Sequence, residues 1–444
     1  MFYIVESEEQ LHTLDSFKDE KCYIEVISSN NNYHPKLVHT VAVYLRPVSH
    51  HKGYIIPISH SEGLNVAKDR VSAILRTFQS LYTLDKKNLL YHFKLPEAID
   101  INLLNTLTNF TKIEERKTTN TFNWYYSRFS EHKRLNSIIP ITKLYEDCEN
   151  RYEQVKRFLD VEIPQGFEFY NKTATSVFYL IEQSGIRVIE KPFIELFKPQ
   201  NPVFNIQDNI VYTSYNLNNI TSRPTNAFNS VNFTAIPKAP EFRKAIIPRN
   251  DYFVEFDYDG YHLRLLCEQI GYELTEEPAH RQLAKLYYKK EEITDEEYQK
   301  AKQTNFHAIY GKIPPEYAFL EVFDKIQTYI DRLWKQFKEQ GYVEDPISGR
   351  RFTQDLPDMH PQKLMNYMMQ SIETSRNTLV SKELLKYLQG KKTTIALYTY
   401  DALLLDFKED DGKHILQDID QIISQNNKYP TNVKVGRSLN LERR

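Results

Sequence analysis

The stretch YQKAKQTNFHAIYG, residues 298–311, places four side chains at a spacing of four: Tyr298, Lys302, Phe306 and Tyr310. A helix turns by about 100° per residue, so this spacing keeps all four on one face. A face that packs into a core would carry Leu, Ile or Ala, whereas this one carries a cation followed by two aromatic rings. Lysine binds phosphate and aromatic faces stack on bases. The alternative is a partly exposed helix whose Lys stem and rings cover apolar surface.

The composition is that of a chain of about two or three domains, since it has 444 residues. Lys and Arg number 57 against 59 Asp and Glu, so a site for a polyanion must be a local basic groove. The three cysteines, Cys22, Cys148 and Cys267, are scattered, which argues against zinc and disulfides. No signal-peptide core and no apolar run of about 20 residues is found. We therefore expect a soluble, cytoplasmic protein with no membrane partner.

The first 140 residues begin with three apolar runs typical of strands: CYIEVIS (22–28), KLVHTVAVYLRP (36–47) and GYIIPISH (53–60). A helix is predicted from Val71 to Tyr82. This order predicts a small α/β domain over residues 1–140. Helical patterns follow from Pro140, and residues 191–240 are rich in Pro and Asn, which is typical of loops and a domain boundary.

From residue 251 onward, compact signals for strands and helices alternate. YFVEFDYDG (252–260) predicts a strand with acid at its end, and TTIALYTYDALLLDF (393–407) predicts a hairpin with Asp401 at its bend. Between them, helices are predicted over HLRLLCEQIG (262–271), around Lys302, from Pro315 to Gln340 and from Pro361 to Leu388, with a hairpin around ISGRRF (347–352).

Asp257 and Asp401 each follow an apolar strand-like run. An unpartnered Asp at such a place would carry a desolvation cost of several kcal/mol, which a cation can offset. Two such acids can hold a pair of Mg²⁺ ions roughly 3.5–4 Å apart, the arrangement that nucleotidyl transfer needs. Each Asp taken alone is more simply a turn residue or a helix cap.

Three of these segments, FDYDGYHLRLL (256–266), KQTNFHAIYG (302–311) and YTYDALLLD (398–406), occur in the order of the three polymerase motifs of family A DNA polymerases, and the chain resembles that family. Further similar segments are TSRPTNAFNSVNFTAIP (221–237), GYVEDPISGRRF (341–352), NYMMQSIETS (366–375) and VKVGRSLNLE (433–442). The resemblance extends from about Ala174 to the C-terminus.

The resemblance implies that Asp257 and Asp401 are the catalytic acids that hold two Mg²⁺ ions, with Mn²⁺ as a substitute, together with the backbone carbonyl of Tyr258. Lys302 and His280 would lie near the triphosphate of the incoming nucleotide. Phe306 would lie against its sugar and base, and Tyr310 would occupy the position of the templating base. The residues that the resemblance places against DNA are Arg223, Asn232, Arg264, Arg350, Asn366, Gln370 and, near the primer end, Tyr400.

The chain departs from the family pattern at several positions: His307 replaces a helix glycine, Tyr400 replaces a histidine, and three further changes bear on the nucleotide and metal sites. His262 stands where the family has a glutamate that excludes ribose by crowding the sugar 2′ position. Tyr298 replaces an arginine that contacts the triphosphate. Ala402 replaces a glutamate that the two-metal scheme does not require. We expect activity to be retained, with discrimination between dNTP and NTP left open.

A long helical thumb is expected between the segments LIEQSGIRV (180–188) and VYTSYNLNNITSR (211–223), but only about 20 residues separate them. Each residue adds about 1.5 Å of helix, so two long antiparallel helices do not fit. We expect a much reduced thumb and low intrinsic processivity, or a partner protein that supplies the missing clamp.

The amino-terminal segment resembles the RNase H-like 3′-to-5′ exonuclease domain of the same family, with Asp147 at the place of its last metal-binding acid. The first motif, expected as Asp-x-Glu, reads Tyr23-Ile24-Glu25, and residues 91–97 supply no Asp. Two metals need about four carboxylates, so two are too few. We interpret this domain as a degenerate exonuclease.

The predicted fold is α/β (α+β), with an exonuclease-type domain over 1–140, connecting helices, remnant thumb and template-primer segment over 141–240, and palm and fingers over 241–444, the fingers at about 272–340. The predicted function is template-directed DNA synthesis in replication without proofreading, with primed DNA and dNTPs as partners. Two alternatives stay open: a single-subunit RNA polymerase or primase-like enzyme, and an inactive polymerase-like binding module. The compact, Asn- and Lys-rich sequence suggests a phage or mobile element.

Overall fold

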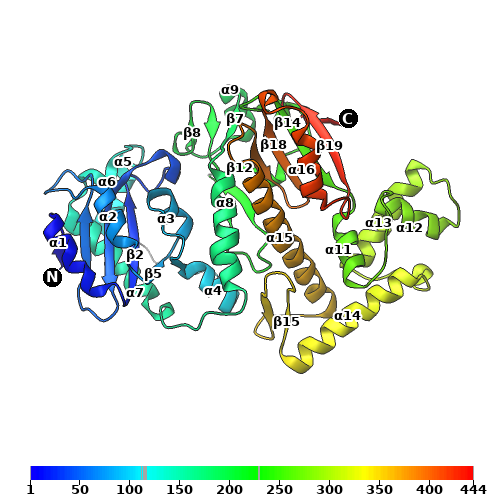
Figure 1. Cartoon of the computed structure of the whole chain (residues 1–444), viewed down its shortest axis with the longest axis horizontal. Helices are drawn as coiled ribbons and strands as arrows, with labels where there is room; N and C mark the ends of the chain where they lie inside the picture. The colour runs from blue at the N-terminus through cyan, green and yellow to red at the C-terminus, as the bar shows by residue number, and fades with distance from the viewer. Residues whose placement is uncertain (1, 112, 114–117, 229–230, 444) are drawn as a thin grey trace. The chain divides into compact units, whose positions relative to one another are not determined.

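The computed structural model describes residues 2–111, 113, 118–228 and 231–443 (Figure 1). The chain divides into two compact units. The first comprises residues 1–185, 190–218 and 226–231, and the second comprises 186–189, 219–225 and 232–444. Asn229 and Ser230, within the predicted template-primer segment, lie outside the described residues.

The first unit is built on a six-stranded mixed sheet of order β1-β4-β3-β2-β5-β6. Its strands are β1 (Tyr3–Ile4), β2 (Lys21–Ser28), β3 (Thr40–Pro47), β4 (Tyr54–Pro57), β5 (Ser80–Thr83) and β6 (Ile99–Asp100). β2 and β3 pair antiparallel, whereas β2 and β5 pair parallel. Side chains alternate along β2, so Ile24 and Val26 join one buried cluster while Tyr23 and Ile27 join the other. The sheet is therefore covered on both faces.

Helices pack against this sheet: α1 (Glu8–His12), α2 (Lys68–Leu75), α3 (Lys86–His92), α4 (Ile101–Asn109), α5 (Asn120–Phe129), α6 (Leu135–Ile138) and α7 (Ile141–Val155). The helices α8 (Thr175–Glu182) and α9 (Glu190–Phe197) also belong to the first unit. The helix predicted from Val71 to Tyr82 is shorter, because SLYT (80–83) pairs with β2 as strand β5. Leu144, Cys148 and Tyr152 of α7 are buried in the sheet's cluster, so this helix belongs to the first unit although it follows residue 140.

The segment between residues 186 and 221, all of it described, holds only short elements. Its longest helix is α9, which has 8 residues. Its other elements are the short strands β7 (Ile186–Val188), β8 (Ile206–Gln207), β9 (Ile210–Val211) and β10 (Tyr215–Asn216) and a 3₁₀ turn over Pro202–Phe204. This segment therefore contains no pair of long antiparallel helices.

The second unit is centred on a five-stranded antiparallel sheet of order β17-β18-β14-β19-β20. Its strands are β14 (Tyr252–Tyr258), β17 (Thr394–Tyr398), β18 (Ala402–Phe407), β19 (Thr431–Gly436) and β20 (Glu442–Arg443). The strand predicted before Asp257 is the central strand β14, and the hairpin predicted around Asp401 is β17–β18. Phe253, Val254 and Phe256 are buried, which fixes the orientation of β14 in the core.

The remaining elements of the second unit are α10 (Pro240–Lys244), α11 (Tyr261–Gln269), α12 (Ala279–Tyr288), α13 (Asp295–Tyr310), α14 (Glu321–Gln340), α15 (Pro361–Tyr387), α16 (Ile415–Ser424) and the strand pairs β7 (Ile186–Val188) with β13 (Ile246–Ile247) and β15 (Tyr342–Glu344) with β16 (Arg351–Thr353). The strands β11 (Thr225–Phe228) and β12 (Val231–Asn232) fall mostly within residues 226–231, which belong to the first unit. The helix predicted from Pro315 begins only at Glu321, because Pro315–Tyr317 form a separate 3₁₀ turn. Thr294 and Glu297 form a capping box that starts α13.

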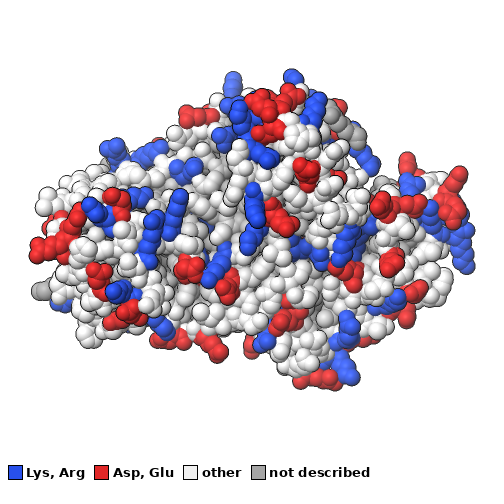
Figure 2. All heavy atoms as spheres, viewed as in Figure 1, with Lys and Arg blue, Asp and Glu red and all other residues white. Residues whose placement is uncertain are grey.

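The charged side chains at the surface and the three cysteines are arranged as the composition led us to expect. On the face shown in Figure 2, Lys and Arg lie among Asp and Glu, as a net charge of −2 requires. All three cysteines are buried and unpaired. Among the described residues, no helix combines the length and the apolar character needed to cross a membrane.

Candidate active site

The central sheet of the second unit brings the two predicted catalytic acids together. Asp257 lies near the end of β14, opposite Ala402 of β18. The backbone N–H of Tyr258 donates a hydrogen bond of 2.9 Å to the carbonyl of Asp401. Tyr400 adopts a left-handed backbone with φ of 67°, which turns the chain between β17 and β18. The register and the bend therefore place both carboxylates at the same end of the strands, where β14 ends and the β17–β18 hairpin turns.

The electrostatic environments of these two acids differ. Lys434 of β19 lies 2.8 Å from Oδ2 of Asp257 and 2.8 Å from Oε1 of Glu255. Asp401 forms no ion pair among the described residues. Burial by surrounding atoms, the carboxylate of Asp257 and that of Glu373 raise the pKa of Asp401 to about 6, although its side chain stays accessible from solvent. The arrangement concentrates negative charge that a bound cation would relieve.

These acids line a cleft of about 650 Å³ within the second unit. The predicted site residues that line it are Asp257, Tyr258, Asp401, His262, His280, Tyr298, Lys302, Phe306, Tyr310, Arg223, Asn366 and Gln370. Lining residues that the sequence did not single out include Lys238, Asp259, Glu373 and Asn432. The structure thus brings most of the predicted site to one cavity.

The predicted face of α13 lies along this cleft. Lys302 is exposed, and the Phe306 side chain is 44% exposed. The rings of Phe306 and Tyr310 are stacked, with centroids 6.0 Å apart. Tyr298 packs against the buried cluster beneath α13, and the guanidinium of Arg281 lies 5.5 Å from its ring. A cation and two open aromatic rings therefore face the same space as the carboxylates.

His280 of α12 is buried beside these rings. Its Nδ1 accepts a hydrogen bond of 2.9 Å from the amide of Asn305, a residue of α13 that the sequence did not single out. Burial lowers the pKa of His280 to about 4, and the cations Lys302 and Arg264 act in the same direction. His280 is therefore neutral near pH 7 and adds no charge to the cleft.

Two arginines predicted to contact DNA are engaged within the protein. Arg264 is buried and donates to the backbone carbonyls of Asp259, Thr275 and Glu277, at 3.0, 2.9 and 2.7 Å. Arg350 is also buried, and its guanidinium donates to the hydroxyl of Ser222 and the carbonyl of Ile220. Both residues organise loops of the second unit, because their planar donor forks match several carbonyls at once. Neither lines the cleft.

Asn232 and Tyr400 also lie outside the cleft lining. Asn232 is exposed, and its side chain accepts hydrogen bonds from the backbone and hydroxyl of Thr234. The hydroxyl of Thr234 lies 3.2 Å from the hydroxyl of Tyr400, at hydrogen-bond distance. The guanidinium of Arg223 lies over the Tyr400 ring, 3.9 Å from its centroid.

Glu373 is the buried acid of the site that the sequence reasoning missed. It lies on α15, three residues after Gln370, whose amide donates to Asn366 at 2.8 Å. Asn377, four residues further along, donates to the carbonyl of Tyr400 at 2.6 Å. The spacing 366, 370, 373, 377 is a polar stripe at helical periodicity. This polar stripe is the sequence signal that could have identified Glu373 as a residue of the site.

The carboxylates suit a hard divalent cation. No group of three or more His, Cys, Asp or Glu side chains within the described residues could hold a metal. Mg²⁺, however, is commonly bound through one or two carboxylates together with substrate phosphates and water. Asp401, which has no ion pair among the described residues, and Asp257 beside it in the same accessible cleft fit that mode of binding.

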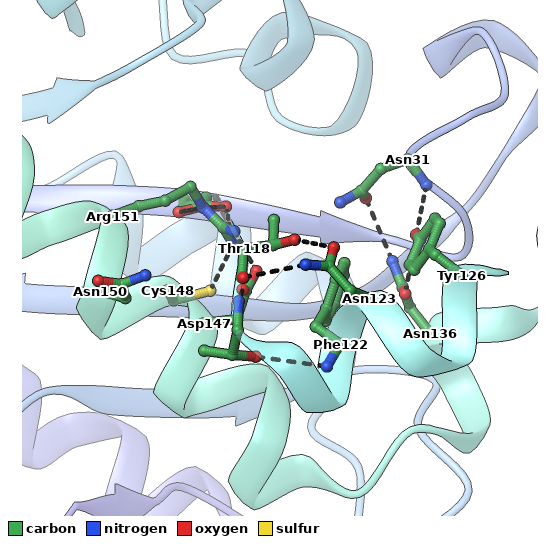
Figure 3. Close-up of polar contacts among 12 residues, drawn as sticks. Asn31, Thr118, Phe122, Asn123, Tyr126, Asn136, Asp147, Cys148, Asn150 and Arg151 are labelled. Atoms are coloured by element: carbon green, nitrogen blue, oxygen red, sulfur yellow. Dashed lines mark hydrogen bonds and ion pairs between the residues drawn. The ribbon is translucent and has the colours of Figure 1, made fainter. Parts of the chain in front are cut away.

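A second polar pocket, of about 390 Å³, lies in the first unit and is lined in part by Glu25 and Asp147, the two acids that the exonuclease resemblance singled out. Arg151 contacts both of them. Its Nε donates to the two oxygens of Glu25 at 2.8 and 3.0 Å, and its Nη1 donates to Asp147. Figure 3 shows Arg151 and Asp147 on α7, beside Cys148 and Asn150. A guanidinium from the chain itself therefore engages both carboxylates and offsets one of their two charges.

Five asparagines are among the other residues that line this pocket, and Asn31 and Asn123 are two of them. The hydroxyl of Tyr126, another lining residue, donates to the side chain of Asn136 at 3.0 Å (Figure 3). Asp85 also lines this pocket, although the sequence did not single it out. It caps α3, because its side chain accepts a hydrogen bond of 3.0 Å from the backbone N–H of Asn88. Asp85 is exposed, and it does not complete a three-acid metal cluster among the described residues.

Comparison with known proteins bears on both units. A family model described as DNA polymerase family A matches residues 186–442. A solved structure, the POL domain of Pol1 from M. smegmatis in complex with DNA primer-template and dNTP, is similar with a TM-score of 0.65. It is 13% identical in sequence, and the similarity covers 99% of this chain and 99% of that chain. No curated protein matches the sequence. The similarity confirms the mixed α/β fold, and the family match confirms the resemblance carried by the motifs.

Proposed function

The chain belongs to DNA polymerase family A, and on that premise we propose that it adds deoxynucleoside monophosphates to a primer 3′ hydroxyl by two-metal nucleotidyl transfer during replication. The observation that carries the proposal is the cleft in which Asp257 and Asp401 face Lys302, Phe306 and Tyr310. Primed DNA and dNTPs are its partners.

In this proposal Asp257, Asp401 and the backbone carbonyl of Tyr258 would hold the divalent ions. Bound there, Mg²⁺ would promote loss of the primer hydroxyl proton and neutralise the leaving pyrophosphate. Lys302 supplies a positive charge for the triphosphate. Phe306 and Tyr310 offer stacked rings against which the sugar and base can lie.

In this proposal, fewer residues contact the duplex directly than the sequence suggested. Arg223, Asn366 and Gln370 line the cleft and keep polar atoms near it. Asn232 is exposed and also remains a candidate. Arg264 and Arg350 would act indirectly, by holding the loops that border the cleft.

The test is primed-template extension with dNTPs or NTPs by the wild type, Asp257→Asn and Asp401→Asn. Extension with dNTPs that both substitutions abolish supports the proposal. Asp410→Asn is the matched control, since Asp410 is an acid of the same unit that pairs with Lys392 at 2.8 Å on the surface. Preference for NTPs would favour an RNA polymerase or primase-like enzyme, which the replacement of glutamate by His262 keeps open. No extension under any condition would favour an inactive binding module.

The same proposal includes the absence of proofreading. Its support is Arg151, which engages both remaining acids of the amino-terminal pocket. A labelled single strand should therefore survive incubation with the protein and Mg²⁺. Rapid degradation that Glu25→Ala abolishes would overturn this part of the proposal.

Low intrinsic processivity is the third part. Its support is the segment 186–221, whose longest helix has 8 residues. Extension measured against a DNA trap should stop after few additions, unless a partner protein supplies a clamp. Products hundreds of nucleotides long from a single encounter would contradict this part and leave the polymerase assignment intact.

A further inference from the structure

The surface formed by helix α5 and the turn that follows it is rich in aromatic and basic side chains. Residues 120–134 include three Lys or Arg residues and one acid, Glu131. Trp124 and Phe129 are large apolar side chains that stay 47% and 46% exposed. Their rings lie edge to face with centroids 6.1 Å apart, and the guanidinium of Arg128 lies 4.5 Å from the centroid of the Trp124 ring. Two large rings and a cation therefore meet solvent together.

The turn after α5 continues this surface with further cations. The N–H of His132 donates to the carbonyl of Phe129 at 2.9 Å, and the side chain of Asn30 donates to the carbonyl of His132 at 3.0 Å. Lys133 and Arg134 follow directly in the chain and are exposed. The loop after β2 thus holds the turn in one shape, so the two cations are presented at a fixed place beside the rings.

These cations have no acidic partner in the part of the chain that the structure describes. The three cations of this surface and the exposed Lys68 form no ion pair there. Burial lowers the pKa of His39, and three cations act in the same direction: Arg134, Lys68 and Lys133. All three therefore lie within electrostatic reach of one imidazole ring. In a chain of net charge −2, such a gathering is the local basic surface that a polyanion needs.

We propose that the α5 surface, formed by Trp124, Arg128, Phe129, Lys133 and Arg134, binds single-stranded nucleic acid. Exposed rings stack on bases that are unpaired, and the neighbouring cations match the phosphates of the same strand. None of these five residues lines the pocket that holds the two exonuclease-type acids, so the α5 surface is a separate site. The inference goes beyond the proposed function, because it concerns binding by the first unit and no step of nucleotide transfer.

The test compares two labelled strands of about 12 nucleotides, oligothymidylate and a strand of abasic residues, by fluorescence anisotropy with the full chain. We expect the wild type to bind oligothymidylate about tenfold more tightly than the abasic strand, because only the former has bases that can stack. Trp124→Ala should remove most of that difference, and Phe129→Ala a smaller part. The matched control is Phe319→Ala, which removes a 69% exposed ring of the second unit and should change neither affinity.

The cations are tested independently by Lys133→Gln combined with Arg134→Gln. The plot of log affinity for oligothymidylate against log salt concentration should become shallower by about 1.4, since each phosphate contact contributes about 0.7 to its slope. Lys18→Gln combined with Arg157→Gln is the control, because it removes two exposed cations of the same unit that are not part of the α5 surface. The control should leave the slope unchanged.

Equal affinity of the wild type for the two strands, or unchanged binding by Trp124→Ala, would overturn the proposal. If Trp124→Ala does not fold, the charge variant decides, because an unchanged salt slope also contradicts binding at this surface. Variants that lose affinity for phosphatidylglycerol vesicles but keep their affinity for oligothymidylate would assign the surface to an anionic membrane and overturn the proposal too. Failure of the proposed function would show separately, as no primer extension by the wild type.

Discussion

The polymerase cleft and the amino-terminal pocket each hold two carboxylates, but the protein neutralises them to different extents. In the pocket, Arg151 contacts Glu25 and Asp147 together. In the cleft, Lys434 contacts Asp257, and Asp401 forms no ion pair among the described residues. A carboxylate that has no ion pair within the protein remains available to an external cation. Asp401 of the cleft meets that condition, whereas Arg151 engages both acids of the pocket.

The largest expected effect separates the two pairs by activity. Asp401→Asn should reduce primer extension by about 1,000-fold or more, since the metal-assisted step supplies several kcal/mol. Asp147→Asn should leave extension within about twofold, because its acid lies in the other unit and pairs with Arg151. Steady-state extension of a short primed template measures both. An equal loss in the two variants would show that the pocket contributes to synthesis.

The contrast between the two pairs could be seen only in part from the sequence. Asp257 and Asp401 were predictable because each ends an apolar run, and a strand or hairpin carries it to a sheet edge. Arg151 follows Asp147 by four residues, so their ion pair could be predicted from the spacing of neighbours on one face of a helix. The contact with Glu25 spans 126 residues of chain, and no local pattern encodes it.

The same limit applies to the arginines and the buried acid of the cleft. Arg264 and Arg350 fit DNA-binding positions in the motif order, but backbone carbonyls that only the fold supplies occupy their donors. Glu373 looked like one more charge on a long helix, because its partners His262 and Arg223 lie far away in sequence. Sequence motifs therefore identified the side chains that line the cleft better than the side chains that hold the surrounding loops and helices in place.

The second prediction tests whether Arg151 replaces a cation. Arg151→Met should lower the free energy of unfolding of the first unit by about 3 kcal/mol, since it leaves a buried acid without its partner. Urea denaturation followed by Trp124 fluorescence measures it, in a Trp334→Phe background that silences the tryptophan of the second unit. The control combines Arg151→Met with Glu25→Gln and Asp147→Asn and should recover most of the loss. Wild-type stability of the single variant would mean that the acids need no internal cation.

The third prediction uses acid to probe the first unit. Burial lowers the pKa of His34 to about 3, below its unfolded value of 6.5. The unfolded chain therefore binds more protons between these values, and stability falls as pH drops below 6.5. One such group contributes at most about 1.4 kcal/mol per pH unit in that window. His34→Gln should flatten the decline in unfolding free energy between pH 7 and pH 5, measured through Trp124. The exposed His414, replaced in the same way, should change nothing, and a decline unaffected by His34→Gln would place the acid response elsewhere.

The smallest expected effect concerns the partial neutralisation in the cleft itself. Lys434 holds a positive charge against one oxygen of Asp257, so it opposes a divalent ion at that carboxylate. Lys434→Met should tighten Mn²⁺ binding to the protein without DNA or nucleotide by roughly fivefold, about 1 kcal/mol for a partly exposed pair. Electron paramagnetic resonance of free Mn²⁺ during titration measures the affinity. Lys408→Met, which removes a cation paired with Asp251 outside the cleft, is the matched control and should have no effect. Weaker Mn²⁺ binding in Lys434→Met would mean that the ammonium orients Asp257 for the metal. The two regions would then differ in what their internal cations do, as well as in how many acids of each pair those cations engage.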